Sequence, residues 1–192
     1  DSEDAALDRA VSIYREVVRS EPDSAHAHVL LGRALSSKED YVGAIHEYRT
    51  AIRLQPSYAW ANANLGLTLE DKGDHEGAGR ELREAIGLEP DNPYAHYRLG
   101  ALNYRKGDWV GAIASFREAI RLEPDDAEGH YNLGRALRGK GDPDGAIASF
   151  HEAIRLYALA VADGPGHSGK AYLADAHYGL GQIGRASCRE RG

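Results

Sequence analysis

The chain has 192 residues, 42% of them hydrophobic, and a formal net charge of -7 at pH 7. A pI near 5.7 argues against a general nucleic-acid binder, which would carry a basic stripe, and a mean hydropathy of -0.53 argues against a membrane protein. The single cysteine, Cys188, excludes an intrachain disulfide.

One pattern of large and small residues returns every 34 residues along the chain. Leu-Gly pairs mark it at Leu31-Gly32, Leu65-Gly66, Leu99-Gly100 and Leu133-Gly134. Other places keep the same step, with small residues at Ala44, Ala78, Ala112 and Ala146 and large residues at Tyr48, Leu82, Phe116 and Phe150. A fixed period of this size predicts a stacked array of one repeated helical unit.

The first segment, residues 1–24, is predicted to be a half repeat. Ala10, Tyr14 and Pro22 match the second half of the pattern, and no first half precedes them. The chain begins with Asp1 and contains no methionine, so we expect the native start to be missing. The compartment is therefore not predicted beyond a weak preference for the cytoplasm.

Four full repeats follow, at residues 25–58, 59–92, 93–126 and 127–162. Each is predicted to form two helices, separated in three repeats by a Gly-Asp turn such as Gly107-Asp108 and in the first by Glu39-Asp40. A Leu-x-Pro sequence ends the second helix of three of them, because proline disfavours a helical residue before it. Acidic or hydroxyl residues then follow as candidate caps of the next helix, at Ser57, Asp91 and Asp125-Asp126.

The pattern changes after Ala153, where an apolar run predicts a longer second helix. Residues 163–169 are rich in glycine and are predicted to be a linker. Residues 170–183 restart a first helix, with Leu180-Gly181 in the expected place, and are predicted to cap the array or form a partial repeat. Residues 184–192 resemble a translated sequencing-adapter segment, so we expect an artefactual, disordered tail.

These positions resemble the tetratricopeptide repeat (TPR), a helix-turn-helix unit of 34 residues. The resemblance covers residues 5–157 and again residues 170–183, with approximate ends. It implies an all-α, right-handed superhelical solenoid that binds protein or peptide partners without a cofactor. No Walker loop, Rossmann glycine fingerprint or metalloprotease motif is present in the sequence, and no enzyme activity is expected.

In the TPR family, the first helices line the concave groove of the superhelix. Carried over residue by residue, the resemblance implies a peptide-binding set made of Arg33, Trp60, Asn64, Tyr94, Tyr97, Arg98, Tyr131, Asn132 and Arg135. Asparagine amides can clamp a peptide backbone, arginines can bind a carboxylate, and aromatic rings supply rigid contact area. The alternative is that some of these aromatic residues only pack between units.

Two groove types known in the family fit this set only in part. Asn64 and Arg98 match two places of the carboxylate clamp of chaperone-binding members, but lysine fills none of its lysine places. Asn64 and Asn132 match the asparagine ladder of sugar-transferring members, but Leu30 and Arg98 interrupt it. We therefore expect a general groove for extended peptides, with some preference for acidic groups or C-terminal carboxylates.

The sequence thus predicts a scaffold or adaptor with a protein or peptide partner and no nucleic-acid partner, membrane span, cofactor or metal. The histidines form no metal set, because His28, His96 and His130 occupy the same place of different units, which the family uses for large packing residues. Two alternatives stay open. The chain can be the repeat region of a larger enzyme, such as a glycosyltransferase, or a structural array that self-associates.

Overall fold

The computed structural model describes residues 2–162, Ala174 and residues 176–181, and the regular secondary structure of these residues is entirely helical. The helices are α1 (Ser2–Ser20), α2 (Ala25–Ser37), α3 (Tyr41–Leu54), α4 (Ala59–Asp71), α5 (His75–Leu88), α6 (Pro93–Arg105), α7 (Trp109–Leu122), α8 (Ala127–Lys140) and α9 (Pro143–Ala162). Within the described part of the chain, no helix has the length and apolar character needed to cross a bilayer. The all-α prediction is confirmed.

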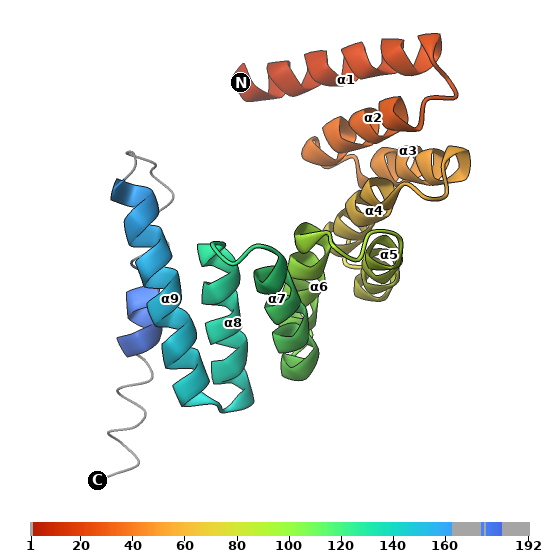
Figure 1. The fold of residues 1–192 in the computed structure, drawn as a ribbon. Coiled ribbons are helices and arrows are strands. Elements are labelled where there is room, and N and C mark those ends of the chain that lie inside the picture. The colour runs from red at the N-terminus through yellow and green to blue at the C-terminus, as the bar shows by residue number, and fades with distance from the viewer. Residues whose placement is uncertain (1, 163–173, 175, 182–192) are drawn as a thin grey trace. The chain divides into compact units, whose positions relative to one another are not determined.

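The helices form two compact units, an N-terminal unit (Asp1–Asp91) and a C-terminal unit (Asn92–Gly192). In the N-terminal unit, each helix from α1 to α5 packs against the next, and α2 also contacts α4 (Figure 1). In the C-terminal unit, α6 to α9 pack in the same sequential manner, and α6 also contacts α8. Each unit therefore sets the first helices of two successive repeats beside each other.

A glycine on the first helix and a large residue on the second make the close contact within each repeat. A Cβ atom added at Gly32 would lie 2.7 Å from Cε1 of Tyr48, and one added at Gly100 would lie 2.8 Å from Cδ1 of Phe116. Both rings are 1% exposed. Because glycine has no side chain, the ring packs directly against the first helix and fills the space between the two helices.

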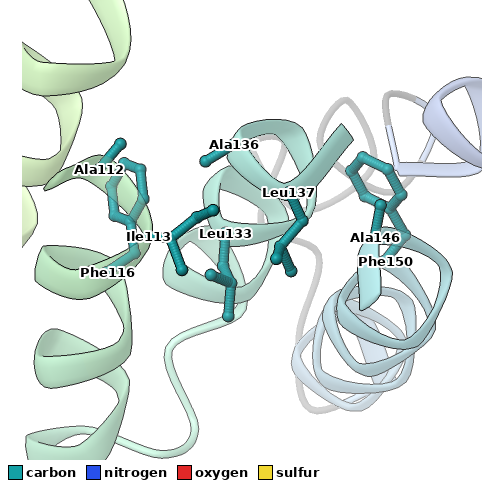
Figure 2. Close-up of a cluster of buried hydrophobic side chains, with 8 residues drawn as sticks. All are labelled: Ala112, Ile113, Phe116, Leu133, Ala136, Leu137, Ala146 and Phe150. Atoms are coloured by element: carbon teal, nitrogen blue, oxygen red, sulfur yellow. The ribbon is translucent and has the colours of Figure 1, made fainter. Parts of the chain in front are cut away.

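Figure 2 shows buried hydrophobic side chains that join successive repeats in the C-terminal unit. The buried cluster drawn there consists of Ala112, Ile113, Phe116, Leu133, Ala136, Leu137, Ala146 and Phe150, from α7, α8 and α9. Tyr97 and Tyr131 pack against its edge, with ring centroids 5.7 Å from Phe116 and 5.8 Å from Phe150 respectively. The first helices are therefore anchored by the core that lies beneath them.

The C-terminal end of the array departs from the regular repeat. Helix α9 has 20 residues, whereas α7 has 14. Leu180, in the helical residues 176–181, packs against the buried cluster, and Ala176 is fully buried. The predicted linker at 163–169 and the predicted tail at 184–192 lie outside the described residues.

The aspartates of the turns cap the second helices. Their side chains accept hydrogen bonds from the backbone N–H three residues later, at Asp40, Asp74, Asp108 and Asp142. The caps predicted for two first helices were wrong, since α4 is capped by Tyr58 without a side-chain bond and α6 by Asn92. Capping by Ser57 and Asp91 would require α4 and α6 to begin at residues 58 and 92, but each helix begins one residue later. At α8, the side chain of Asp126 accepts from Glu128 N at 3.0 Å, as predicted.

Two histidines have a polar role where the sequence predicted packing alone. The Nε2 atom of His28 lies 2.9 Å from the carbonyl oxygen of Pro22, and that of His130 lies 3.0 Å from the carbonyl oxygen of Pro124. The Nδ1 atom of His28 also lies 2.6 Å from Oε2 of Glu47. These side chains tie a first helix to the turn that precedes it, which satisfies a backbone acceptor that no helix serves.

The turn inside each full repeat contains one residue with positive φ. Three of these are glycines, Gly73, Gly107 and Gly141, with φ of 90°, 75° and 84°. The first full repeat has Glu39 there, with φ of 60°. A side chain in this region is strained, because Cβ approaches the following carbonyl oxygen.

Replacing Glu39→Gly should therefore stabilise the N-terminal unit by about 0.5 to 1 kcal/mol, since the relief of strain exceeds the entropy that glycine adds to the unfolded chain. Urea unfolding followed by circular dichroism measures the change. Gly107→Ala provides the reverse control and should destabilise the protein. A loss of stability in the Glu39→Gly variant would contradict the assignment of strain to this position.

Candidate functional site

In the N-terminal unit, the predicted site residues lie on α2 and α4. The guanidinium carbon of Arg33 is 5.8 Å from the ring centroid of Trp60, within the range of a cation–π contact. Asn64 is only 9% exposed, and its amide donates to the carbonyl oxygen of Trp60 at 2.7 Å. The more accessible part of this face is thus Arg33 with the edge of the half-buried Trp60.

In the C-terminal unit, the predicted residues come together on α6 and α8. Tyr94, Tyr97 and Arg98 lie on α6, and Tyr131, Asn132 and Arg135 lie on α8, so that three- and four-residue spacings place each set on one helical face. Because α6 and α8 contact each other, both sets line a common cleft, except Tyr94, which lines the adjoining cleft.

A chain of hydrogen bonds crosses this cleft. The Tyr97 hydroxyl donates to Oε1 of Glu128 at 2.6 Å, and the Asn132 amide donates to the Tyr97 hydroxyl oxygen at 2.9 Å. The Arg135 guanidinium donates to Oδ1 of Asn132 at 3.2 Å. Each side chain in this hydrogen-bonded series therefore fixes the orientation of the next.

The Tyr97 hydroxyl keeps its proton. Burial raises its pKa well above the ordinary value, and the hydrogen bond to Glu128 raises it further, because both disfavour a phenolate. Tyr97 therefore donates to the carboxylate and accepts from Asn132, which sets the direction of the whole chain.

Aromatic rings support the arginines of the cleft. The guanidinium carbon of Arg135 lies 4.5 Å from the ring centroid of Tyr104 and 5.6 Å from that of Tyr131. The guanidinium carbon of Arg98 lies 5.9 Å from the ring centroid of Tyr94, which is 41% exposed. An aromatic ring at this distance attracts the guanidinium group and restricts its motion. The arginine therefore loses less conformational entropy when it binds a ligand.

Two adjoining clefts run along this face. The first has a volume of about 450 Å³ and is lined by Pro93, Tyr94, Tyr97, Arg98, Ala119, Glu123, Asp126 and Glu128. The second has a volume of about 430 Å³ and is lined by Tyr97, Arg98, Ala101, Tyr104, Arg105, Phe116, Glu128, Tyr131, Asn132 and Arg135. Both contain Tyr97, Arg98 and Glu128, so they form one continuous surface, which we call the α6–α8 cleft.

Sequence reasoning did not include Tyr104, which is the ring nearest to Arg135. Helical spacing could have indicated it, because Tyr104 follows Tyr97 by seven residues. This is close to two helical turns and places both rings on the same face of α6. A further cleft, of about 280 Å³, lies between α1 and α2 and contains none of the predicted residues. There the Lys38 ammonium pairs with the Asp8 carboxylate.

The fold and the site together define a class of protein, an array of helical hairpins whose first helices expose arginine, amide and aromatic groups. Profiles of the tetratricopeptide repeat match residues 63–127, 111–161 and 131–187, and a TPR repeat profile matches residues 32–73. The chain belongs to the tetratricopeptide repeat family. TPR arrays are general scaffolds for protein interaction.

Solved structures with this fold include several TPR proteins. A crystal structure of MamA has a TM-score of 0.74 at 23% identity, covering 83% of this chain and 94% of that chain. MamA from Desulfovibrio magneticus RS-1 has a TM-score of 0.71 at 22% identity, covering 80% of this chain and 87% of that chain. The structure of YrrB, titled a TPR protein with an unusual peptide-binding site, has a TM-score of 0.66 at 21% identity and covers 91% of this chain and 86% of that chain.

These similarities concern the fold, and they confirm the predicted TPR solenoid. A search of curated protein sequences gives no match.

Proposed function

We propose that this protein is an interaction scaffold that binds an extended peptide segment of a partner protein, with the α6–α8 cleft as the principal site. The observation that carries the proposal is the hydrogen-bonded chain from Glu128 through Tyr97 and Asn132 to Arg135. It holds polar groups in fixed positions on an open surface, which lowers the cost of ordering them when a ligand binds.

The composition of the cleft also supports peptide binding over catalysis. Tyr94 and Tyr97 provide aromatic area, and Arg98 and Arg135 provide charged donors, the residue types enriched where binding energy concentrates. The two adjoining clefts are lined by residues from the beginning of α6 to its last turn, an extent suited to a chain segment. YrrB, which shares the fold, is described as having a peptide-binding site.

The N-terminal unit offers a smaller candidate surface around Arg33, Trp60 and Asn64. We propose that it is a separate surface for peptide contacts, with Arg33 and Trp60 as the accessible groups. The Asn64 amide uses one of its two N–H donors for a bond within its own helix.

A peptide-array screen with the full chain tests the proposal. Hits from the wild type should be weakened at least about tenfold by Arg98→Ala combined with Asn132→Ala, because charge-assisted hydrogen bonds contribute about 1.5 to 3 kcal/mol each. Arg117→Ala is the matched control, since Arg117 is exposed on α7 outside the cleft, and it should leave the hits unchanged.

A second double variant, Arg33→Ala with Asn64→Ala, measures how much the N-terminal surface contributes to peptide binding. Hits that survive both double variants would place binding elsewhere on the molecule. An array without hits, repeated with light scattering at several concentrations, would favour self-association as the role of the repeats.

A further inference from the structure

The α6–α8 cleft carries opposite charge at its two ends. Glu123 and Asp126 line only the first cleft, Arg105 and Arg135 line only the second, and Arg98 and Glu128 line both. The acidic character continues past the first cleft, because the adjoining surface is lined by Leu122, Glu123, Pro124, Asp125 and Asp126. A ligand that spans the cleft therefore meets carboxylates at one end and guanidinium groups at the other, with Arg98 and Glu128 between them.

The side-chain contacts show that α6 and α8 run in parallel. Tyr97 bonds to Glu128 and Asn132, whereas Tyr104, one residue short of the end of α6, lies against Arg135. The acidic end thus lies at the amino-terminal ends of both helices. Glu128 and Arg135 are seven residues apart on one helix, which corresponds to roughly 10 Å along its axis.

These two charges are kept apart rather than paired with each other. The neutral side chains of Tyr97 and Asn132 lie between them in the hydrogen-bonded chain. Among the described residues, the Glu128 carboxylate bonds to Tyr97 and the Arg135 guanidinium to Asn132, and no ion pair joins the two charges. Each charge can therefore gain from an opposite charge on a ligand.

The helix dipole does not account for the arrangement. It explains an acidic residue in the first turn of α8, such as Glu128, and the basic residues of its last turn, Arg138 and Lys140. Arg135 lies in neither turn, and its position is set by the rings of Tyr104 and Tyr131 and by Asn132. The bond to Asn132 uses one of its five N–H donors, and Arg135 lines the second cleft.

Resting on the proposed function, we propose that the ligand of the α6–α8 cleft is an extended peptide with one basic and one acidic side chain three residues apart. The basic group binds at Glu128 and Asp126, and the carboxylate binds at Arg135. A polyproline II segment advances about 3.1 Å per residue with three residues per turn, so residues three apart lie on the same face about 9 Å apart. In a β-strand, same-face residues are about 6.6 or 13 Å apart, which fits the cleft less well.

Fluorescence anisotropy with short labelled peptides tests this inference on the full chain. The set holds lysine and glutamate one, three or six residues apart in a neutral background, in both chain orders. Two further peptides keep the three-residue spacing but replace lysine by norleucine or glutamate by glutamine. We expect one order of the three-residue spacing to bind best, at least about tenfold more tightly than either single-charge peptide.

Two protein variants assign each charge to its end. Glu128→Gln should remove the advantage of the lysine, measured as the ratio of the affinities of the lysine and norleucine peptides for the same variant. Arg135→Gln should remove the advantage of the glutamate in the same manner. Asp144→Asn, in the first turn of α9, and Arg117→Gln, on α7, make the same charge changes outside the cleft and should have no effect.

The outcomes separate this inference from the proposed function. Equal affinity for all spacings, with binding still weakened by Arg98→Ala combined with Asn132→Ala, would overturn the charge pattern and leave the peptide groove in place. Binding of no peptide in either this set or the array would overturn both. If a glutamine variant loses its helical circular dichroism, the norleucine and glutamine peptides decide the question on the wild type.

Discussion

Replacing Phe116→Ala should destabilise the C-terminal unit by about 3 to 5 kcal/mol. The ring is 1% exposed, fills the space beside Gly100 and belongs to the cluster that joins α7, α8 and α9. Its removal loses the transfer free energy of a buried aromatic and leaves a cavity that helices of fixed spacing close only in part. Tyr97 packs against the same ring, with centroids 5.7 Å apart, so the cleft should loosen as well.

Urea unfolding followed by circular dichroism measures this effect, with tyrosine and tryptophan fluorescence as a second probe because repeat arrays can unfold in parts. Val110→Ala is the control, since Val110 lies on the same helix and is 65% exposed. It should change the free energy of unfolding by less than about 0.5 kcal/mol. A Phe116→Ala loss below about 1 kcal/mol would show that the cluster does not hold the unit together.

Replacing Gly32→Val should destabilise the N-terminal unit by at least about 2 kcal/mol. The first added carbon would lie 2.7 Å from Cε1 of Tyr48, a contact that real Cβ atoms essentially never make. Tyr48 is 1% exposed and cannot move without displacing its neighbours, so α2 and α3 must separate. Overpacking of this kind typically costs about 1 to 3 kcal/mol, and the branched side chain places it at the upper end.

A second glycine of the same unit supplies a control of opposite sign. Gly87 lies in α5, and a Cβ atom added there would meet nothing within 4 Å. Gly87→Ala should therefore stabilise the helix by about 0.5 to 1 kcal/mol, because alanine loses less backbone entropy. Thermal melting of both variants gives the comparison, and a Gly32→Val protein as stable as the wild type would contradict the close-contact explanation.

The repeat period was sufficient to predict the helices, because each repeat uses the same local chemistry. The 34-residue step placed a small residue against a large one, as found for Gly100 and Phe116. Helix ends were less predictable. Ser57 and Asp91 were expected to be caps, but the neighbouring residues Tyr58 and Asn92 occupy those positions, since several polar residues in a row can each begin a helix.

The sequence by itself determined the fold, because a repeated pattern of glycine, alanine and aromatic residues is enough to specify a hairpin that stacks on copies of itself. It also selected six residues that line the α6–α8 cleft, since their place on one helical face depends only on helical spacing. The tertiary structure alone decided what those residues do. It buried Asn64 against its own helix, linked Tyr97 to Glu128 and Asn132, and placed Arg135 over Tyr104. The contacts of Tyr97 and Arg135 join residues 31 to 35 positions apart, and only the packing of successive repeats brings them together.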